Sequence, residues 1–302
     1  MKKIVVGSRE SRLAVVQSMS LVDHLRAAGF EVELLTMKTT GDKILDRTLD
    51  KVGGKGLFVK ELDAALLEGR ADLAVHCVKD LPMELAPGTA LLGYSRREDA
   101  RDALVLPEGV EDFRRGVIGT SSLRRAIQLK ALFPDSEIRP VRGNLITRLK
   151  KLDDGEYDAL VLAVAGLKRL GLDDRISRVF ETDEIIPAAG QGILAVEGRA
   201  GGEHPDISGF TDPNAAACAE CERAFVRELD GGCTSPVCAN AAIHRGWLTV
   251  RALYWDPETG ATHIGADSGP ASEAAAIGAR LARRLRDGRS MDERGLQENG
   301  EC

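Results

Sequence analysis

The sequence has no long hydrophobic run and no overall excess of basic residues. Its 302 residues carry a formal net charge of −6. No apolar stretch approaches the ~20 residues that a membrane-spanning helix needs. An acidic balance of this kind gives no overall electrostatic attraction for nucleic acid or for an anionic membrane. No pair of helices resembles a DNA-reading unit, so we expect neither nucleic acid nor a membrane as a partner.

The N-terminus also lacks the features of a secretion signal. Two lysines lead directly into a short apolar strand at residues 4–7, without an apolar core or a small-residue cleavage site. Six cysteines in an unsecreted chain of this length indicate reduced thiols rather than a disulfide framework. We therefore expect a cytoplasmic protein.

A glycine-rich basic segment at residues 51–58 reads Lys-Val-Gly-Gly-Lys-Gly-Leu-Phe and opens a helix that extends to about residue 69. It lacks the Gly-x4-Gly-Lys-Ser/Thr spacing of a P-loop, which argues against a nucleotide site. A mobile basic lid and a plain surface loop both remain open as interpretations.

Short apolar strands alternate with helical patterns through the first two thirds of the chain. Strands are expected at residues 4–7 and 32–37, and the helix between them makes a parallel βαβ unit. Another strand is expected at 72–78, and a second α/β unit begins near residue 101, with strands near 117–119, 138–141 and 158–164. Residues 193–196 are expected to return to the first sheet, so the chain crosses between two lobes near residues 95 and 190.

The last third differs in pattern. An alanine-rich helix at 214–229 is followed by strands from 239 onward, a hairpin at 256–260 and a helix at 271–286. The predicted class is α/β, with two hinged lobes of periplasmic-binding-protein type and a small C-terminal α+β domain. The predicted domains are 1–95 with 193–210, then 98–190, then 213–302.

Basic residues are concentrated in the second α/β unit. Between Arg114 and Arg178 there are 14 Lys and Arg against 8 Asp and Glu. A solvated face is one interpretation, but three strand-to-helix junctions each bring arginine to one edge, where helix N-termini favour anions. The first junction holds Thr120, Ser122, Arg124 and Arg125, the second Arg142 and Arg148, and the third Arg169.

Polar residues also follow two strands of the first unit. Arg9 and Ser11 stand at the first strand-to-helix turn, where open α/β sheets bind ligands, and Ser11 can also cap the helix. Lys79 and Asp80 end the strand at 72–78. Asp80 is either a simple turn former or an ionised carboxylate that stabilises a cation or moves protons in a basic cleft.

A single cysteine lies on a turn after the alanine-rich helix, in Leu-Asp-Gly-Gly-Cys-Thr-Ser-Pro. The glycines and the proline end the helix and would present Cys233 to a cavity. Free cysteines are mostly small buried residues, so this turn alone is weak support for chemistry. Four thiolates, from Cys218, Cys221, Cys233 and Cys238, have a superficial zinc spacing, but the first two lie in a helix former with no turn between them. We expect no metal, and we expect Cys77 to serve packing.

These features describe a cleft between two lobes that is lined with arginines, has one acid at its edge and receives a thiol from a third domain. Such a cleft suits a ligand with several carboxylates or phosphates. Over essentially its whole length, the chain resembles the porphobilinogen deaminase (hydroxymethylbilane synthase) family. The motifs that carry the likeness are residues 9–11, 51–58, 76–82, 119–125, 142–144, 162–170, 190–192 and 231–233.

The resemblance implies a transferase that condenses four porphobilinogen molecules head to tail, with loss of ammonia, and then releases hydroxymethylbilane with water. It implies a covalent dipyrromethane cofactor on Cys233, held through a thioether, and Asp80 as the catalytic acid and base. The implied cofactor-binding residues are Lys79, Thr120, Ser122, Arg124 and Arg125. The implied substrate-binding residues are Arg9, Ser11, Lys55, Phe58, Arg142, Arg148, Arg169 and Gln191, with Lys55 and Phe58 on a flexible active-site loop and Gln191 at an interlobe position.

Four positions depart from the family pattern. They are Arg12 in place of a proline, Thr40 in place of an arginine, Cys77 in place of a serine and Cys238 in place of a small residue. A non-enzymatic two-lobe anion receptor is the competing class, but it would not need the thiol of Cys233 or a carboxylate in the basic cleft. The family suggests a monomer, with porphobilinogen as the small-molecule partner and a downstream uroporphyrinogen-III synthase as a protein partner.

Overall fold

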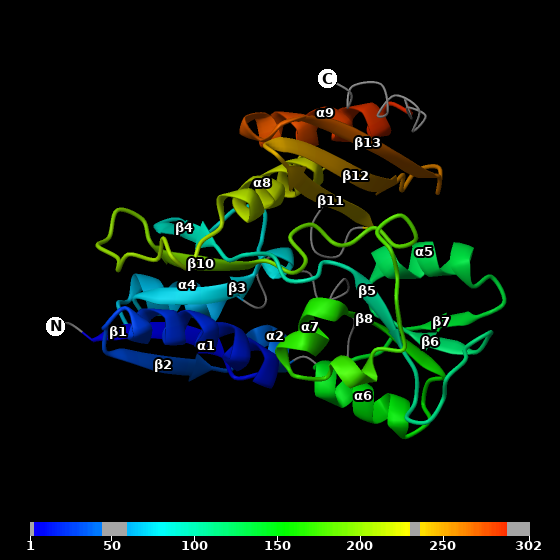
Figure 1. Cartoon of the computed structure of the whole chain (residues 1–302), viewed down its shortest axis with the longest axis horizontal. Coiled ribbons are helices and arrows are strands. Elements are labelled where there is room, and N and C mark those ends of the chain that lie inside the picture. The colour runs from blue at the N-terminus through cyan, green and yellow to red at the C-terminus, as the bar shows by residue number, and fades with distance from the viewer. Residues whose placement is uncertain (1–2, 44–58, 230–235, 289–302) are drawn as a thin grey trace.

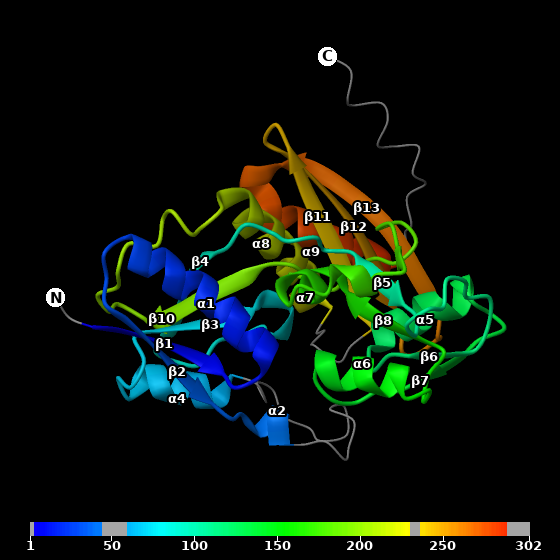
Figure 2. The ribbon, with the colours of Figure 1, turned by 60° about the horizontal axis from the view of Figure 1, so that its bottom comes forward.

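The computed structural model describes residues 3–43, 59–229 and 236–288, which form two lobes and a C-terminal domain (Figures 1 and 2). Each lobe is a five-stranded sheet with helices on its faces, and the C-terminal domain is a three-stranded sheet with helices on one side. The predicted α/β class with two lobes and a small third α+β domain is confirmed. Within the described residues, no helix is both long enough and apolar enough to cross a membrane.

The first lobe is built on a sheet with strand order β2-β1-β3-β10-β4. Its strands are β1 (Ile4–Arg9), β2 (Val32–Met37), β3 (Leu73–Cys77), β4 (Thr89–Tyr94) and β10 (Leu194–Arg199), and its helices are α1 (Arg12–Ala27), the short α2 (Thr40–Lys43) and α4 (Lys60–Leu67). Alternate residues of β1 face opposite sides of the sheet. Val6 joins the core beneath α1, whereas Val5 packs with α4.

The second lobe has strand order β7-β6-β8-β5-β9. Its strands are β5 (Asp102–Val105), β6 (Val117–Gly119), β7 (Glu137–Arg139), β8 (Ala159–Ala163) and β9 (Arg178–Val179), and its helices are α5 (Leu123–Leu132), α6 (Leu145–Asp153), α7 (Val164–Arg169) and the 3₁₀ turn η2 (Asp173–Arg175). Leu129 of α5 packs in the core on one face of this sheet, and Leu149 and Leu152 of α6 pack on the other.

Two connections join the lobes, and we call them the first crossing (residues 95–101) and the second crossing (residues 180–193). The strand that follows each crossing is antiparallel to its neighbour: β5 pairs with β8, and β10 pairs with β3. As a result, Asp102 lies opposite Ala163, and Leu194 lies opposite Cys77. Both crossings therefore deliver their residues to the carboxyl ends of β8 and β3, the edges at which the sequence places its functional side chains.

The C-terminal domain is an antiparallel meander covered by two helices. Its elements are α8 (Pro213–Glu228), β11 (Val237–His244), β12 (Trp247–Trp255), β13 (Thr262–Pro270), the 3₁₀ turn η3 (Ala271–Glu273) and α9 (Ala274–Arg286). Asp212 begins α8, because its Oδ1 accepts hydrogen bonds from the backbone N–H groups of Asn214 and Ala215. Cys218 and Cys221 lie in the apolar core between α8 and the sheet.

Some predicted boundaries shift. The strand predicted at 72–78 ends at Cys77, and the 3₁₀ turn η1 (Val78–Asp80) follows it. The strand predicted at 138–141 is β7, which ends at Arg139, and the helix predicted from 271 starts with the 3₁₀ turn η3. The first shift matters because Lys79 and Asp80, which were predicted to follow directly on the end of the strand, lie in this 3₁₀ turn.

A glycine on α9 allows α8 to approach closely. A Cβ at Gly278 would lie 2.0 Å from the carbonyl oxygen of Cys221 and 3.2 Å from the amide nitrogen of Phe225. We predict that Gly278→Ala forces the two helices apart and lowers the free energy of unfolding by about 3 kcal/mol. Denaturant unfolding measures this loss. Ala276→Ser, at an exposed position of the same helix, should change stability by less than about 0.5 kcal/mol; equal effects of the two substitutions would contradict the close crossing.

Candidate active site

The turn that carries Lys79 and Asp80 is held by the second crossing. The backbone N–H of Val78 donates to the carbonyl of Ile193 at 3.1 Å. Gly190 has a φ of +74°, and a Cβ there would lie 2.2 Å from Cγ1 of Val78. Only glycine meets both conditions without strain. The second crossing therefore packs directly on the turn and leaves Lys79 and Asp80 half-buried.

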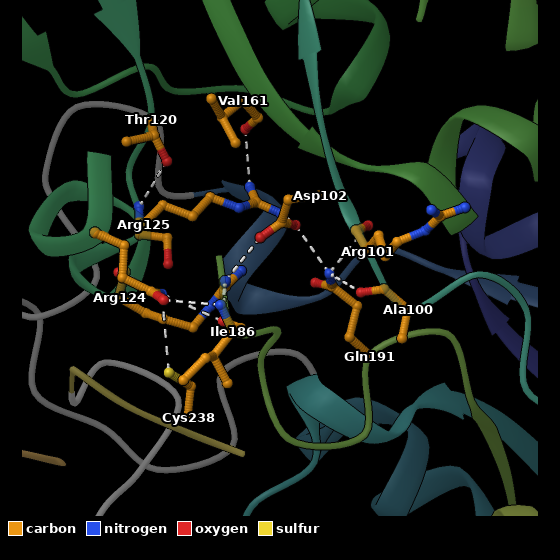
Figure 3. A network of polar contacts seen from close by, with 12 residues as sticks. Ala100, Arg101, Asp102, Thr120, Arg124, Arg125, Val161, Ile186, Gln191 and Cys238 are labelled. Atoms are coloured by element: carbon orange, nitrogen blue, oxygen red, sulfur yellow. Dashed lines mark hydrogen bonds and ion pairs between the residues drawn. The ribbon is translucent and has the colours of Figure 1, made fainter. Parts of the chain in front are cut away.

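Gln191 joins three segments at this point, as Figure 3 shows for two of them. Its Oε1 accepts a hydrogen bond from Lys79 Nζ at 3.2 Å. Its Nε2 donates to the carbonyl of Ala100 at 2.6 Å and to Oδ1 of Asp102 at 2.8 Å. Burial lowers the pKa of Lys79, and the nearby charge of Asp80 opposes that shift. The two crossings and the Asp80 turn are thus connected through a single amide.

Asp102 is a buried anion that the sequence analysis did not identify. Arg124 Nη1 donates to its Oδ2 and Arg125 Nη2 to its Oδ1, each at 2.7 Å (Figure 3). Burial alone would raise the pKa of Asp102, but the two guanidinium groups outweigh burial and hold that pKa well below its usual range. Arg124 and Arg125 were predicted to converge on an anion, and the anion that they meet in the structure is this carboxylate.

Both arginines keep binding capacity beyond Asp102. Arg124 Nη1 also donates to the carbonyl of Ile186, and Arg125 Nη1 donates to that of Val161. The Nε atoms of both side chains are buried and have no hydrogen-bond partner within the described residues. A buried donor without a partner is costly, so an anionic group that accepts from these atoms would be stabilised. At the same junction, Thr120 Oγ1 accepts from the backbone N–H of Ser122.

The second junction brings Arg148 toward the same charges. Asn144 caps α6 by accepting from the N–H of Thr147 at 3.0 Å, and Arg148 Nε donates to the carbonyl of Gly143 at 2.9 Å. Burial lowers the pKa of Arg148 to about 10, the charges of Arg125 and Arg142 add to this shift, and the charge of Asp80 opposes it. Charges from both lobes therefore act on Arg148 together.

The polar residues at the third junction and at the first turn make contacts that stabilise the fold. Arg169 Nη2 donates to the carbonyl of Gly192 at 2.6 Å, which ties α7 to the second crossing. Ser11 Oγ accepts from the N–H of Ala14 at 3.3 Å, so the predicted capping role of Ser11 is confirmed. Arg9 is the last residue of β1 and is half-buried.

Cys77 has a polar neighbour in addition to its packing contacts. It lies at the end of β3 and packs against the first-lobe core, as predicted, but its Sγ also accepts a hydrogen bond from Gln17 Nε2 at 3.1 Å. Burial raises the pKa of the Cys77 thiol, and the charge of Asp80 adds to this shift. Cys77 therefore stays protonated beside the Asp80 turn.

Three predicted site residues, Lys55, Phe58 and Cys233, lie outside the described residues. The structure does describe the elements on either side of Cys233: α8 ends at Glu228, and β11 begins at Val237. Within the described part of the chain, no group of three or more His, Cys, Asp or Glu side chains is placed to hold a metal ion.

The C-terminal domain is held to the crossings by a second buried carboxylate that the sequence analysis missed. Arg97 Nη2 donates to both oxygens of Glu222, at 2.8 and 2.7 Å. The same carboxylate accepts from the backbone N–H groups of Gly190 and Ala241, each at 2.6 Å. The next residue, Arg223, donates to the carbonyl of Pro82, just after the Asp80 turn. Helix α8 is therefore fixed relative to both crossings and to Asp80.

Comparison with known proteins accounts for nearly the whole chain. Residues 4–206 match a family model described as the porphobilinogen deaminase dipyrromethane cofactor binding domain, and residues 216–287 match the porphobilinogen deaminase C-terminal domain. The chain belongs to the porphobilinogen deaminase family. The first match assigns dipyrromethane as the cofactor of this family domain, and the buried Nε groups of Arg124 and Arg125 suit its carboxylates.

Individual relatives agree with this assignment. The chain is 50% identical over 287 residues to a porphobilinogen deaminase from Ruminiclostridium cellulolyticum, with 94% of this chain and 98% of that protein covered. It is 49% identical over 302 residues to one from Chromobacterium violaceum, with 95% of each covered. Among solved structures, the sulphonate-binding protein SsuA from Escherichia coli is similar with a TM-score of 0.39 and 13% identity, over 76% of this chain and 71% of that one.

Glu222 offers a direct test of how the C-terminal domain is attached. We predict that Glu222→Ala lowers the free energy of unfolding by about 3–5 kcal/mol, because Arg97 and two backbone N–H groups lose a buried anionic partner. Thermal or denaturant unfolding measures the loss. Glu220→Ala removes an exposed carboxylate from the same helix and should be nearly neutral. Similar stability of the two variants would show that the Glu222 contacts do not hold the domain.

Proposed function

We propose that this protein is a porphobilinogen deaminase, a transferase that joins four porphobilinogen molecules head to tail with loss of ammonia and releases hydroxymethylbilane by hydrolysis. The observation that carries the proposal is the buried pair Arg124 and Arg125, whose Nε donors lack partners within the described residues, in a family domain that binds dipyrromethane. The proposed attachment point of that cofactor is Cys233. When bound, dipyrromethane supplies the pyrrole carbon to which the first substrate unit is added.

The chain's own residues would act through their charges on the groups that react. Asp80 is half-buried on the turn beside Lys79. A fixed carboxylate in a partly buried site stabilises the cation that forms when ammonia leaves porphobilinogen, and it can accept or return a proton at the pyrrole. Because Asp80 is near enough to act on the pKa of Arg148 from the other lobe, acid and arginines serve one site.

Arginine is the residue suited to the anionic side chains of the substrate. Each pyrrole carries an acetate and a propionate, so a six-ring chain brings ~12 carboxylates into the cleft, and guanidinium groups bind carboxylates through paired donors. We propose that Lys79, Thr120, Ser122, Arg124 and Arg125 hold the cofactor. We propose that Arg9, Ser11, Lys55, Phe58, Arg142, Arg148, Arg169 and Gln191 contact substrate or the growing chain.

The remaining assignments belong to the same proposal. The domains are proposed as 1–95 with 193–210, 98–190 and 213–302. We propose a cytoplasmic monomer without a metal, whose product passes to a uroporphyrinogen-III synthase. We propose that neither nucleic acid nor an anionic membrane is a partner, because a net charge of −6 gives no overall electrostatic attraction to either.

The attachment of the cofactor can be tested by intact mass. Protein purified from cells that make porphobilinogen should carry an added mass of two pyrrole units, and Cys233→Ser should lack that mass because the thioether sulfur is gone. Cys77→Ser, which changes a cysteine at the Asp80 turn, should retain the adduct. Wild-type protein of unmodified mass would reject the proposed function.

The proposed role of Asp80 predicts that removing its charge slows product formation but leaves the bound cofactor in place. Asp80→Asn should keep the two-pyrrole adduct and lower the rate of hydroxymethylbilane formation by about 100-fold or more, because the neutral amide cannot stabilise the cation or exchange a proton. The rate is measured by product absorbance after oxidation. Glu84→Gln removes an exposed carboxylate four residues away and should remain within about twofold of wild type. Full activity of Asp80→Asn would reject the catalytic assignment.

A further inference from the structure

The paired arginines of α5 adopt an arrangement that a helix does not produce by itself. Arg124 and Arg125 are consecutive residues of α5. Consecutive side chains leave a helix roughly 100° apart and do not face each other. Yet their guanidinium groups meet at one carboxylate, each on a different oxygen of Asp102 (Figure 3). The convergence therefore depends on Asp102 and not on the helix.

Burial makes this dependence strong. Asp102 is fully buried, and Arg124 and Arg125 are only 4% and 7% exposed. Burial lowers the pKa of Arg125, and the charge of Asp102 opposes that shift, whereas the charge of Arg124 adds to it. Two neighbouring guanidinium groups that repel each other in a buried site need a shared counterion to stay side by side.

The orientation of Asp102 is itself fixed from outside the arginine pair. Asp102 begins β5 directly after the first crossing, with its position set by pairing opposite Ala163. Gln191, from the second crossing, donates to the same Oδ1 that Arg125 uses. Gln191 also accepts a hydrogen bond from Lys79. Through Gln191, the carboxylate of Asp102 therefore fixes the position of the arginine pair relative to the turn that carries Asp80.

We propose that Asp102 is a positioning residue for cofactor loading. It holds the guanidinium groups of Arg124 and Arg125 together, at a fixed place relative to Lys79, so that the remaining donors of both arginines can receive the carboxylates of the incoming pyrroles. Asp102 acts through these arginines and through Gln191, and needs no contact of its own with the cofactor. This inference rests on the proposed function.

The test follows the appearance of the adduct over time. Apoprotein is made in cells unable to synthesise porphobilinogen, and porphobilinogen is then added while intact mass is recorded. Asp102→Asn keeps the shape of the side chain and removes its charge. We expect it to gain the two-pyrrole mass at least tenfold more slowly than wild type, at temperatures where circular dichroism shows both to be folded.

A matched variant separates positioning from stability. Asp72 is also a buried aspartate; it accepts from the backbone N–H of Val5 at 2.9 Å and pairs with Arg199, but it precedes β3, at the opposite end of that strand from Asp80. Asp72→Asn should therefore destabilise the protein and still load at the wild-type rate. If both variants load equally slowly, or if Asp102→Asn loads as fast as wild type, the inference is overturned.

A second substitution covers the case in which Asp102→Asn does not fold. Asp102→Glu keeps the charge but moves the carboxylate by one methylene group, so positioning predicts slow loading although the arginines stay neutralised. Loading of Asp102→Glu at the wild-type rate would overturn the inference. A wild-type apoprotein that never gains the adduct would instead reject the proposed function.

Discussion

The carboxylate of Asp102 is the interaction on which the arrangement of the site depends. It receives two guanidinium groups and one amide in a position without solvent exposure. An ion pair inside a protein gains stability only when its geometry is good and its remaining polar atoms are satisfied. Here Gln191 adds a third donor to the carboxylate and at the same time connects the second lobe to Lys79 in the first, whereas the Nε atoms of both arginines have no partner within the described residues.

The two crossings place such buried anions where the parts of the molecule meet. Because β5 and β10 run antiparallel to their neighbours, each crossing enters its sheet at the carboxyl ends of the adjacent strands, where Asp102 and Gln191 are then found. Glu222 does the same for the C-terminal domain by binding Arg97 of the first crossing and the backbone of Gly190 in the second. Directional polar contacts with unique partners specify one relative placement more strictly than apolar packing would.

The sequence predicts those parts of the site that follow from local structure. Strand-to-helix turns can be recognised in a sequence from their small residues and from the change of hydrophobic period between strand and helix. This is why the sequence locates Arg125, Arg148 and Asp80. Asp102 could not, because a lone acid at the start of an apolar strand acquires its partners only through the pairing of β5 with β8 and through a glutamine 89 residues later. Glu222 was missed for a related reason: it lies among alanines and cysteines on a helix, where a glutamate usually faces solvent.

The same contacts explain how so many arginines can lie close together before a ligand binds them. Burial, together with the charges of Arg125 and Arg142, lowers the pKa of Arg148 to about 10, which marks an electrostatic cost that folding has to bear. The charge of Asp80 offsets part of that cost at Arg148, and Asp102 offsets the repulsion between Arg124 and Arg125 by binding both guanidinium groups at fixed positions. An anionic ligand then meets donors that are already oriented, and the relief of repulsion between them adds to its binding. Repulsion within the arginine cluster therefore lowers the stability of the free protein and raises its affinity for a ligand with several carboxylates.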